Sequence, residues 1–112
     1  MMLVSEVRQI ALSLPGTEEV THWGKPSFRI NNKIFIVIQS DMKTITVKTT
    51  KEEREMYTTT DPKTFIIPET FKNMNYMHIN LETASKDEVK KLIRSAWGIV
   101  APKKMVKIFF ER

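Results

Sequence analysis

Basic side chains near aromatic rings are the residues of this sequence whose types and spacing best suit a chemical role. Cations neutralise phosphates, and aromatic rings stack on bases, so this combination favours nucleic acid as a ligand. The aromatic and polar neighbours in the pattern are Tyr76 and His78. The candidate nucleic-acid-binding residues are Trp23, Lys25, Arg29, Lys33, Lys48, Lys103, Lys104 and Lys107.

The net charge of +5 is unevenly distributed along the chain. Residues 22–50 hold five basic side chains against Asp41, and residues 86–112 hold eight against three acidic ones, so the rest of the chain carries −4. Two basic segments beside acidic ones would attract phosphates, although lysines that only solvate exposed faces would give the same count.

Residue types that carry catalysis or bind metals are sparse. His22 and His78 are the only histidines, and neither has the spacing beside another histidine or carboxylates that a metal site needs. The sequence has three glycines and no phosphate-binding, dinucleotide-binding or nucleophile motif. We therefore expect a binding protein and not an enzyme, with no catalytic residue, no metal and no cofactor.

Length and composition indicate a single globular domain over residues 1–112. With 41% apolar and 28% charged residues, no stretch approaches the roughly 18 apolar residues that span a membrane, so we expect no membrane association. Glu6 and Arg8 interrupt the apolar N-terminus, which argues against a secretory signal. The absence of cysteine excludes disulfides and fits a cytoplasmic protein.

These side chains must be positioned by strands, because residues 22–48 are rich in β-branched and aromatic residues separated by turn-forming ones. A first strand is expected over residues 18–23, a turn or bulge at residues 24–26, and a last strand over residues 76–81. The predicted fold is α+β, with an antiparallel sheet in one layer packed against N- and C-terminal helices in the other.

The hairpin around Asn31 and Asn32 determines which side chains share a face. A two-residue loop would pair Phe28 with Phe35 and place Phe28, Ile30, Phe35 and Val37 on the buried face. The second face would then carry Ser27, Arg29, Ile34, Ile36 and Ile38, and a loop, a partner or another copy should cover its isoleucines. A three-residue loop would instead align Phe28 and Ile30 with Ile34, Ile36 and Ile38. We favour the two-residue loop.

The helices are predicted from apolar spacing and capping residues. One helix should cover residues 3–14, ended by Pro15 and Gly16, and a second should run from Lys51 to residue 56 or 57 behind a Thr50 cap. Ser85 caps a third helix whose apolar side includes Trp97, with Gly98 expected to interrupt it. Pro102 should open a last short helix with its lysines outward.

Several motifs resemble the MmcQ/YjbR-like family, and the likeness covers nearly the whole chain. They are Leu14-Pro15-Gly16-Thr17-Glu18-Glu19, His22-Trp23-Gly24-Lys25-Pro26-Ser27-Phe28-Arg29-Ile30, Lys33-Ile34-Phe35, Ala96-Trp97 and Ala101-Pro102-Lys103-Lys104. Tyr76 departs from the pattern, since such proteins tend to carry a tryptophan there.

The resemblance implies a compact, frataxin-like α+β domain whose exposed hairpins are described as a double wing for DNA binding. A role in iron handling, as in frataxin, would need an acidic helix face, and the first helix offers only Glu6. We therefore expect binding to nucleic acid, DNA rather than RNA, through the sheet hairpins and the basic C-terminal helix. The alternative is a module that binds a protein partner, a second copy or a small ligand through the apolar second face.

Overall fold

The structure, a computed structural model, describes residues 1–111 and contains six strands, four α-helices and one 3-10 turn. The elements are α1 (Val4–Ser13), β1 (Glu18–His22), β2 (Lys25–Ile30), β3 (Lys33–Ile38), β4 (Thr44–Lys48), α2 (Lys51–Thr60), β5 (Phe65–Ile66), η1 (Glu69–Phe71), β6 (Tyr76–Asn80), α3 (Lys86–Val100) and α4 (Lys103–Phe110). The predicted α+β class is confirmed.

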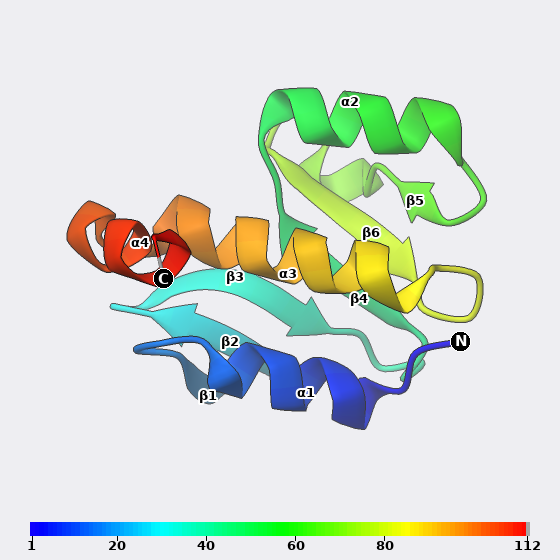
Figure 1. Cartoon of the computed structure of the whole chain (residues 1–112). Helices are drawn as coiled ribbons and strands as arrows, with labels where there is room; N and C mark the ends of the chain where they lie inside the picture. Colours follow the sequence, from blue (N-terminus) through cyan, green and yellow to red (C-terminus); the bar gives the residue numbers. More distant parts are fainter. Residues whose placement is uncertain (112) are drawn as a thin grey trace.

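The six strands form one antiparallel sheet in the order β1-β2-β3-β4-β6-β5. Helices α1, α3 and α4 lie on one face of this sheet, and α2 lies beside β5 at the sheet edge (Figure 1). We call the side under α1 and α3 the covered face and the opposite side the open face. Apolar residues from the covered face, α1 and α3 form one continuous core.

Helix α3 supplies most of the helical contribution to this core. Ser85 caps it by accepting a hydrogen bond from the Glu88 backbone N–H, as predicted. The predicted apolar stripe is buried, and Trp97 is fully buried, with its indole N–H donating to the Pro15 carbonyl at 2.9 Å. The expected interruption at Gly98 is wrong: the helix continues to Val100, since one glycine weakens a well-packed helix without breaking it.

Helix α2 has the predicted capping box between Thr50 and Glu53 but is longer than expected. It continues through the three threonines to Thr60, whereas the sequence predicted an end at residue 56 or 57. The end of the helix packs on the sheet edge, since the Tyr57 ring contacts Phe65 of β5 in a tilted arrangement with the ring centroids 4.8 Å apart. The two-residue strand β5 was not predicted, since it is too short for a periodic pattern.

Two tight hairpins mark the ends of β2. Trp23 and Gly24 form the β1–β2 turn, and Asn31 and Asn32 form the β2–β3 turn; all four residues have positive φ. The two-residue loop at the asparagines is confirmed. Pro26 does not interrupt the strand as expected, because it pairs with Thr21 one step past the hydrogen-bonded pair that closes the turn.

The predicted pairing of Phe28 with Phe35 is wrong. Arg29 pairs with Ile34 but Phe28 pairs with Ile36, so Phe35 is an extra, bulged residue. The bulge reverses the alternation beyond it, and Ile36 and Ile38 therefore lie in the core, while Val37 moves to the open face. Phe28, Ile30 and Phe35 are buried, as predicted.

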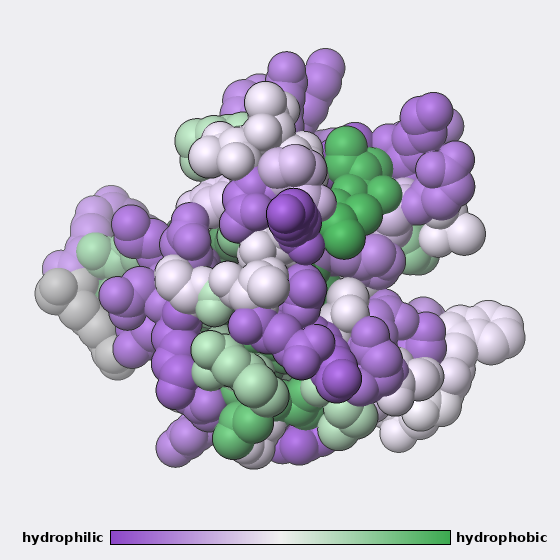
Figure 2. Space-filling view, turned by 90° about the vertical axis from the view of Figure 1, so that its right-hand side faces the viewer, coloured by the Kyte–Doolittle hydropathy of each residue, from purple (hydrophilic) through white to green (hydrophobic). Residues whose placement is uncertain are grey.

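The surface is mainly hydrophilic, with hydrophobic residues gathered in a few patches. Figure 2 faces the right-hand end of Figure 1 and shows two such patches, the upper one at the height of β5. Ile66 of β5 and the adjacent Ile67 are 47% and 40% exposed. Within residues 1–111, none of the helices combines the length and apolar character needed to cross a bilayer.

Candidate nucleic-acid interface

The open face is organised by residues that align across four strands. The strand register places Ser27, Val37, Thr46 and His78 in one row from β2 to β6. On the covered face the neighbouring rows are fully apolar, whereas this row includes three polar side chains. The open face therefore combines hydrogen-bonding groups with apolar side chains, unlike the covered face.

A chain of hydrogen bonds crosses this face. The Lys25 ammonium donates to Gln39 Oε1 at 2.6 Å, and Gln39 Nε2 donates to the Thr46 hydroxyl at 2.8 Å. Because an ammonium can only donate, Lys25 sets the orientation of the Gln39 amide. The Thr46 hydroxyl proton is then free to donate to His78 Nδ1, 2.7 Å away. This chain fixes the side chains that form the floor of the open face.

A groove with a volume of about 460 Å³ runs across the open face. Its lining comes from the β1–β2 hairpin, from β3 and the residue after it, from β4, from β6, and from η1 and the segment that follows it. The lining residues are His22, Trp23, Lys25, Ile34, Val37, Gln39, Thr46, Thr70, Phe71, Met74 and Tyr76. We call this the open-face groove; it contains cationic, aromatic and apolar side chains but no carboxylate among its described lining residues.

Arg54 of α2 holds one wall of the groove in place. Its guanidinium donates to the backbone carbonyls of Phe71, Lys72 and Met74, at 3.2, 3.0 and 2.6 Å, and has a longer contact of 3.4 Å to that of Tyr76. A planar group with five N–H donors suits such a cluster of carbonyls. Arg54 thereby fixes the segment that presents Phe71 and Met74 to the groove.

Three of the predicted cations lie on the open face, and each is half-buried and in contact with a neutral group. Lys25 bonds to Gln39, and Arg29 bonds to Ser27, Asn32 and the His22 ring at 3.1 to 3.2 Å. The Lys48 ammonium lies 5.2 Å from the centroid of the Tyr76 ring, a cation–π contact. Since none of these partners is an anion, the three side chains are positioned while their positive charge stays available.

Two titratable groups of the open face have shifted pKa values, and burial is the main cause for both. Burial and the nearby Lys25 ammonium lower the pKa of His78, while Asp41 raises it to a smaller extent. Burial raises the pKa of Tyr76, so its hydroxyl stays protonated at neutral pH. The imidazole of His78 is therefore neutral at pH 7 and can accept the Thr46 hydrogen bond.

Trp23 has two unusual features at once. Its side chain is 89% exposed, and its backbone has a φ of 54°, a left-handed conformation that is strained for a bulky residue. The ring has one aromatic neighbour, His22, at 6.2 Å in an edge-on arrangement. Strained positions of this kind cluster at functional sites, which makes the β1–β2 turn a candidate contact point.

The remaining predicted cations lie at a different place, which we call the basic end: Lys33 of the β2–β3 hairpin and Lys103, Lys104 and Lys107 of α4. All four side chains are exposed, and none of them forms an ion pair with a described residue. Figure 1 shows the hairpin and α4 at the same end of the molecule. They meet at Gly16, where a Cβ atom would lie 2.8 Å from Ile30 and 3.5 Å from Met105.

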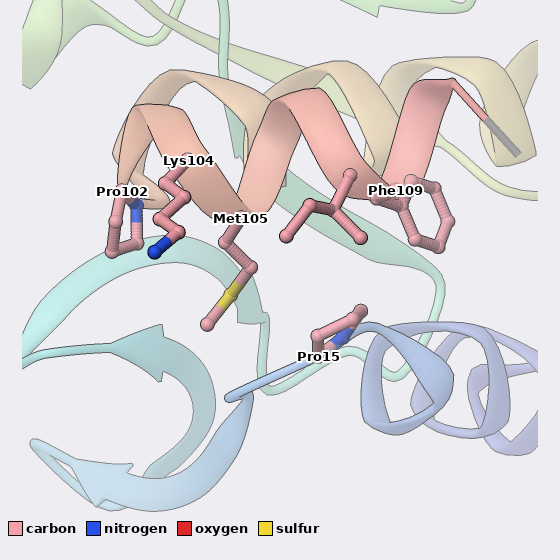
Figure 3. Close-up of a pocket in the computed structure, with 6 residues that line it drawn as sticks. Pro15, Pro102, Lys104, Met105 and Phe109 are labelled. Atoms are coloured by element: carbon pink, nitrogen blue, oxygen red, sulfur yellow. The ribbon is translucent and has the colours of Figure 1, made fainter.

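A second cavity, of about 350 Å³, lies beside α4 at this end. Figure 3 shows Met105 reaching from α4 toward the segment that carries Pro15, with Pro102 and Lys104 at one end of the cavity and Phe109 at the other. Its lining is almost entirely apolar, and Lys104 is the one charged residue among the described residues that line it.

The eight predicted binding residues therefore do not form a single surface. Trp23 and Lys25 line the open-face groove, Arg29 and Lys48 contact groove residues, and the other four lie at the basic end. Arg112, counted in the basic C-terminal segment, lies outside the described residues. The sequence did not reveal Gln39, Thr46, Arg54 or Phe71, because their roles depend on contacts between distant elements.

Residues 1–111 contain no group of three or more histidine, aspartate or glutamate side chains that could hold an ion.

The fold defines a class: small α+β proteins whose antiparallel sheet is covered by helices on one face. The model of the YjbR family matches residues 12–99, and the chain belongs to this family. The predicted family is thus confirmed.

A solved structure shows the same architecture. The crystal structure of the Deinococcus radiodurans protein DR2400, which has a DUF419 domain, matches with a TM-score of 0.81 at 16% identity. The match covers 98% of this chain and 89% of that one. At this identity the likeness shows the fold. No curated protein matches the sequence.

Proposed function

We propose that the protein binds nucleic acid, DNA in preference to RNA, with the open-face groove as the main contact and the basic end as a second one. The observation that carries the proposal is the exposed, strained Trp23 beside half-buried cations whose partners are all neutral. Such cations are already ordered, so binding a phosphate costs them little further side-chain entropy. The four exposed lysines of the basic end would add attraction that depends strongly on salt.

The volume and lining of the groove favour one second candidate. A cavity of about 460 Å³ falls in the range of roughly 300 to 1,000 Å³ that holds small organic ligands, and most of its lining is apolar or aromatic. This candidate is a small aromatic anion, which would contact the same groove side chains as a nucleic acid. Val37 and Ile34, and not the expected Ile36 and Ile38, supply the apolar part of this surface.

A salt-dependent titration tests the proposal. Fluorescence anisotropy with random-sequence DNA, in salt from about 50 to 200 mM, gives the affinity and its logarithmic salt slope. We expect the double change Lys103→Gln and Lys104→Gln to lower the slope by roughly one for each phosphate that the variant no longer neutralises. It should weaken different sequences equally, because phosphate contacts carry no base information.

The matched control is the double change Lys51→Gln and Lys63→Gln, which removes the same charge from exposed lysines outside both contact areas. If the control pair weakens binding as much as the α4 pair, the attraction is diffuse charge and the proposed contact at α4 is wrong. If the parent protein does not bind DNA near physiological salt, the proposal fails and the small-ligand function takes its place.

A further inference from the structure

The open-face groove has aromatic side chains on two sides. His22 and Trp23 come from the β1–β2 hairpin, while Phe71 and Tyr76 come from the far side of the face, in contact with each other at 5.3 Å. The order of strands places β3 and β4 between these two sides; β3 supplies the apolar residues Ile34 and Val37 as a floor, and β4 supplies Thr46. This arrangement fits a flat, apolar group that has two faces to cover.

Cations lie near the aromatic residues on both sides. Lys25 lines the groove beside the hairpin, and Lys48 lies over Tyr76. The described lining contains no carboxylate, so an anionic group attached to the flat one would meet no opposing negative charge there. A planar ring joined to a phosphate is the chemical description of a nucleotide.

The strand form follows from the size and the chemistry of the groove. In a duplex the bases are stacked on each other and paired, so their faces are not available to aromatic side chains, whereas an unpaired base presents both. A cavity of about 460 Å³ is on the scale of a small organic ligand and not of a double helix. Of the two forms of nucleic acid, the unpaired strand is the one whose bases can reach the aromatic residues while its phosphate reaches the cations.

We propose that the open-face groove binds an unpaired nucleotide of a single strand, with the base against Trp23, Phe71 and Tyr76 and the phosphate at Lys25 and Lys48. The inference rests on the proposed nucleic-acid function and specifies the form of the ligand. Trp23 is then the residue that distinguishes single strands from duplexes. The basic end, which has cations without this aromatic groove, contacts phosphates of either form.

The test compares oligothymidylate with a duplex of the same length, using the parent and Trp23→Asn proteins. Asparagine accepts the positive φ of the turn, so this variant removes the ring without straining the fold. We expect the parent to prefer the single strand, and Trp23→Asn to lose about tenfold or more of the affinity for it, since each base stack is worth about one such factor. Duplex affinity should change much less.

The matched control is Met42→Asn. Met42 is also an exposed, apolar residue with positive φ in a turn, at 57% exposure and a φ of 60°, but it lies outside the groove. It should leave both affinities unchanged. Unchanged single-strand affinity in Trp23→Asn, or an equal loss for both forms, overturns the inference while DNA binding stands. A parent that binds neither form defeats the proposed function as well.

Discussion

The two faces of the sheet are made by alternate residues of the same strands, yet they differ in almost every property. On the covered face, Phe28, Ile45 and Ile79 are fully buried against α3 and its neighbours. On the open face, Lys25, Gln39, Thr46 and His78 are linked by hydrogen bonds. The covered face supplies stability by excluding water, while the open face holds polar groups in fixed positions by hydrogen bonds.

The largest expected effect lies on the covered side. Trp97→Ala removes a fully buried ring that packs against Phe109 at 5.0 Å and donates a hydrogen bond to Pro15. We expect it to lower the free energy of unfolding by about 3 to 5 kcal/mol. The open-face comparison is Val37→Ala, which should cost about 1 kcal/mol or less because Val37 is only partly buried. Urea denaturation measures both, and an equal loss would remove the distinction between the faces.

The covered face was largely predictable because several residues of each element carry the same sequence pattern. Ser85 and the apolar spacing up to Trp97 each indicate α3, and Met77, Ile79 and Leu81 alternate as a half-buried strand should. Sequence patterns of this kind average over many residues. A single exception, such as Gly98 inside α3, does not change the outcome, because packing of the whole helix outweighs the propensity of one residue.

The open face was less predictable because it depends on single residues and on contacts between distant segments. One bulged residue, Phe35, moves Ile36 to the covered face and Val37 to the open face. No local sequence pattern predicts this bulge. Arg54 reaches carbonyls 17 to 22 residues away in sequence. Trp23 was identified from its type, but its exposure and positive φ appear only in the structure.

A substitution of Arg54 tests whether one wall of the open-face groove depends on the hydrogen bonds of this residue. Arg54→Lys keeps the charge but cannot donate to the same group of carbonyls, so the segment around Phe71 and Met74 should loosen. We expect a loss of roughly 2 kcal/mol in unfolding free energy, together with faster amide exchange in residues 71–76. Exchange in α3 should stay slow.

The control for this change is Glu55→Gln, on the same helix but exposed and without a described partner. It should alter neither stability nor exchange. If Arg54→Lys speeds exchange uniformly over the molecule, Arg54 supports the whole fold and not the groove wall in particular.

The two turns at the ends of β2 place residues of different types in the same positive-φ conformation. Asn31 and Asn32 suit the positive φ that their turn requires, whereas Trp23 adopts the same conformation at a cost. We therefore expect Trp23→Asn to stabilise the protein by about 1 kcal/mol, as measured by thermal or urea denaturation. A loss of stability in this variant would show that Trp23 packs in the folded protein and has a structural role.

The smallest expected effect concerns the charge of the open face. His78 has a lowered pKa, so the native state binds its proton less readily than the unfolded chain, whose histidines titrate near about 6.5. The stability that depends on neutral His78 is therefore present above about pH 6.5 and is lost as the pH falls through the lowered pKa of His78. The contributions of Asp41 and Glu6, the carboxylates with lowered pKa values, are lost mainly at lower pH, because their ordinary pKa values are 3.8 and 4.5.

Lys25→Met separates the two causes of the lowered pKa of His78. Burial remains in this variant while the repulsion from the ammonium is removed, so the pKa of His78 should rise toward its ordinary value without reaching it. The loss of stability between pH 7 and 5 should shrink accordingly. Lys33→Met, which removes the same charge from the basic end, should leave the His78 titration unchanged in an NMR experiment. If both variants shift it equally, His78 responds to the net charge of the protein, and the open-face groove has no local field of its own.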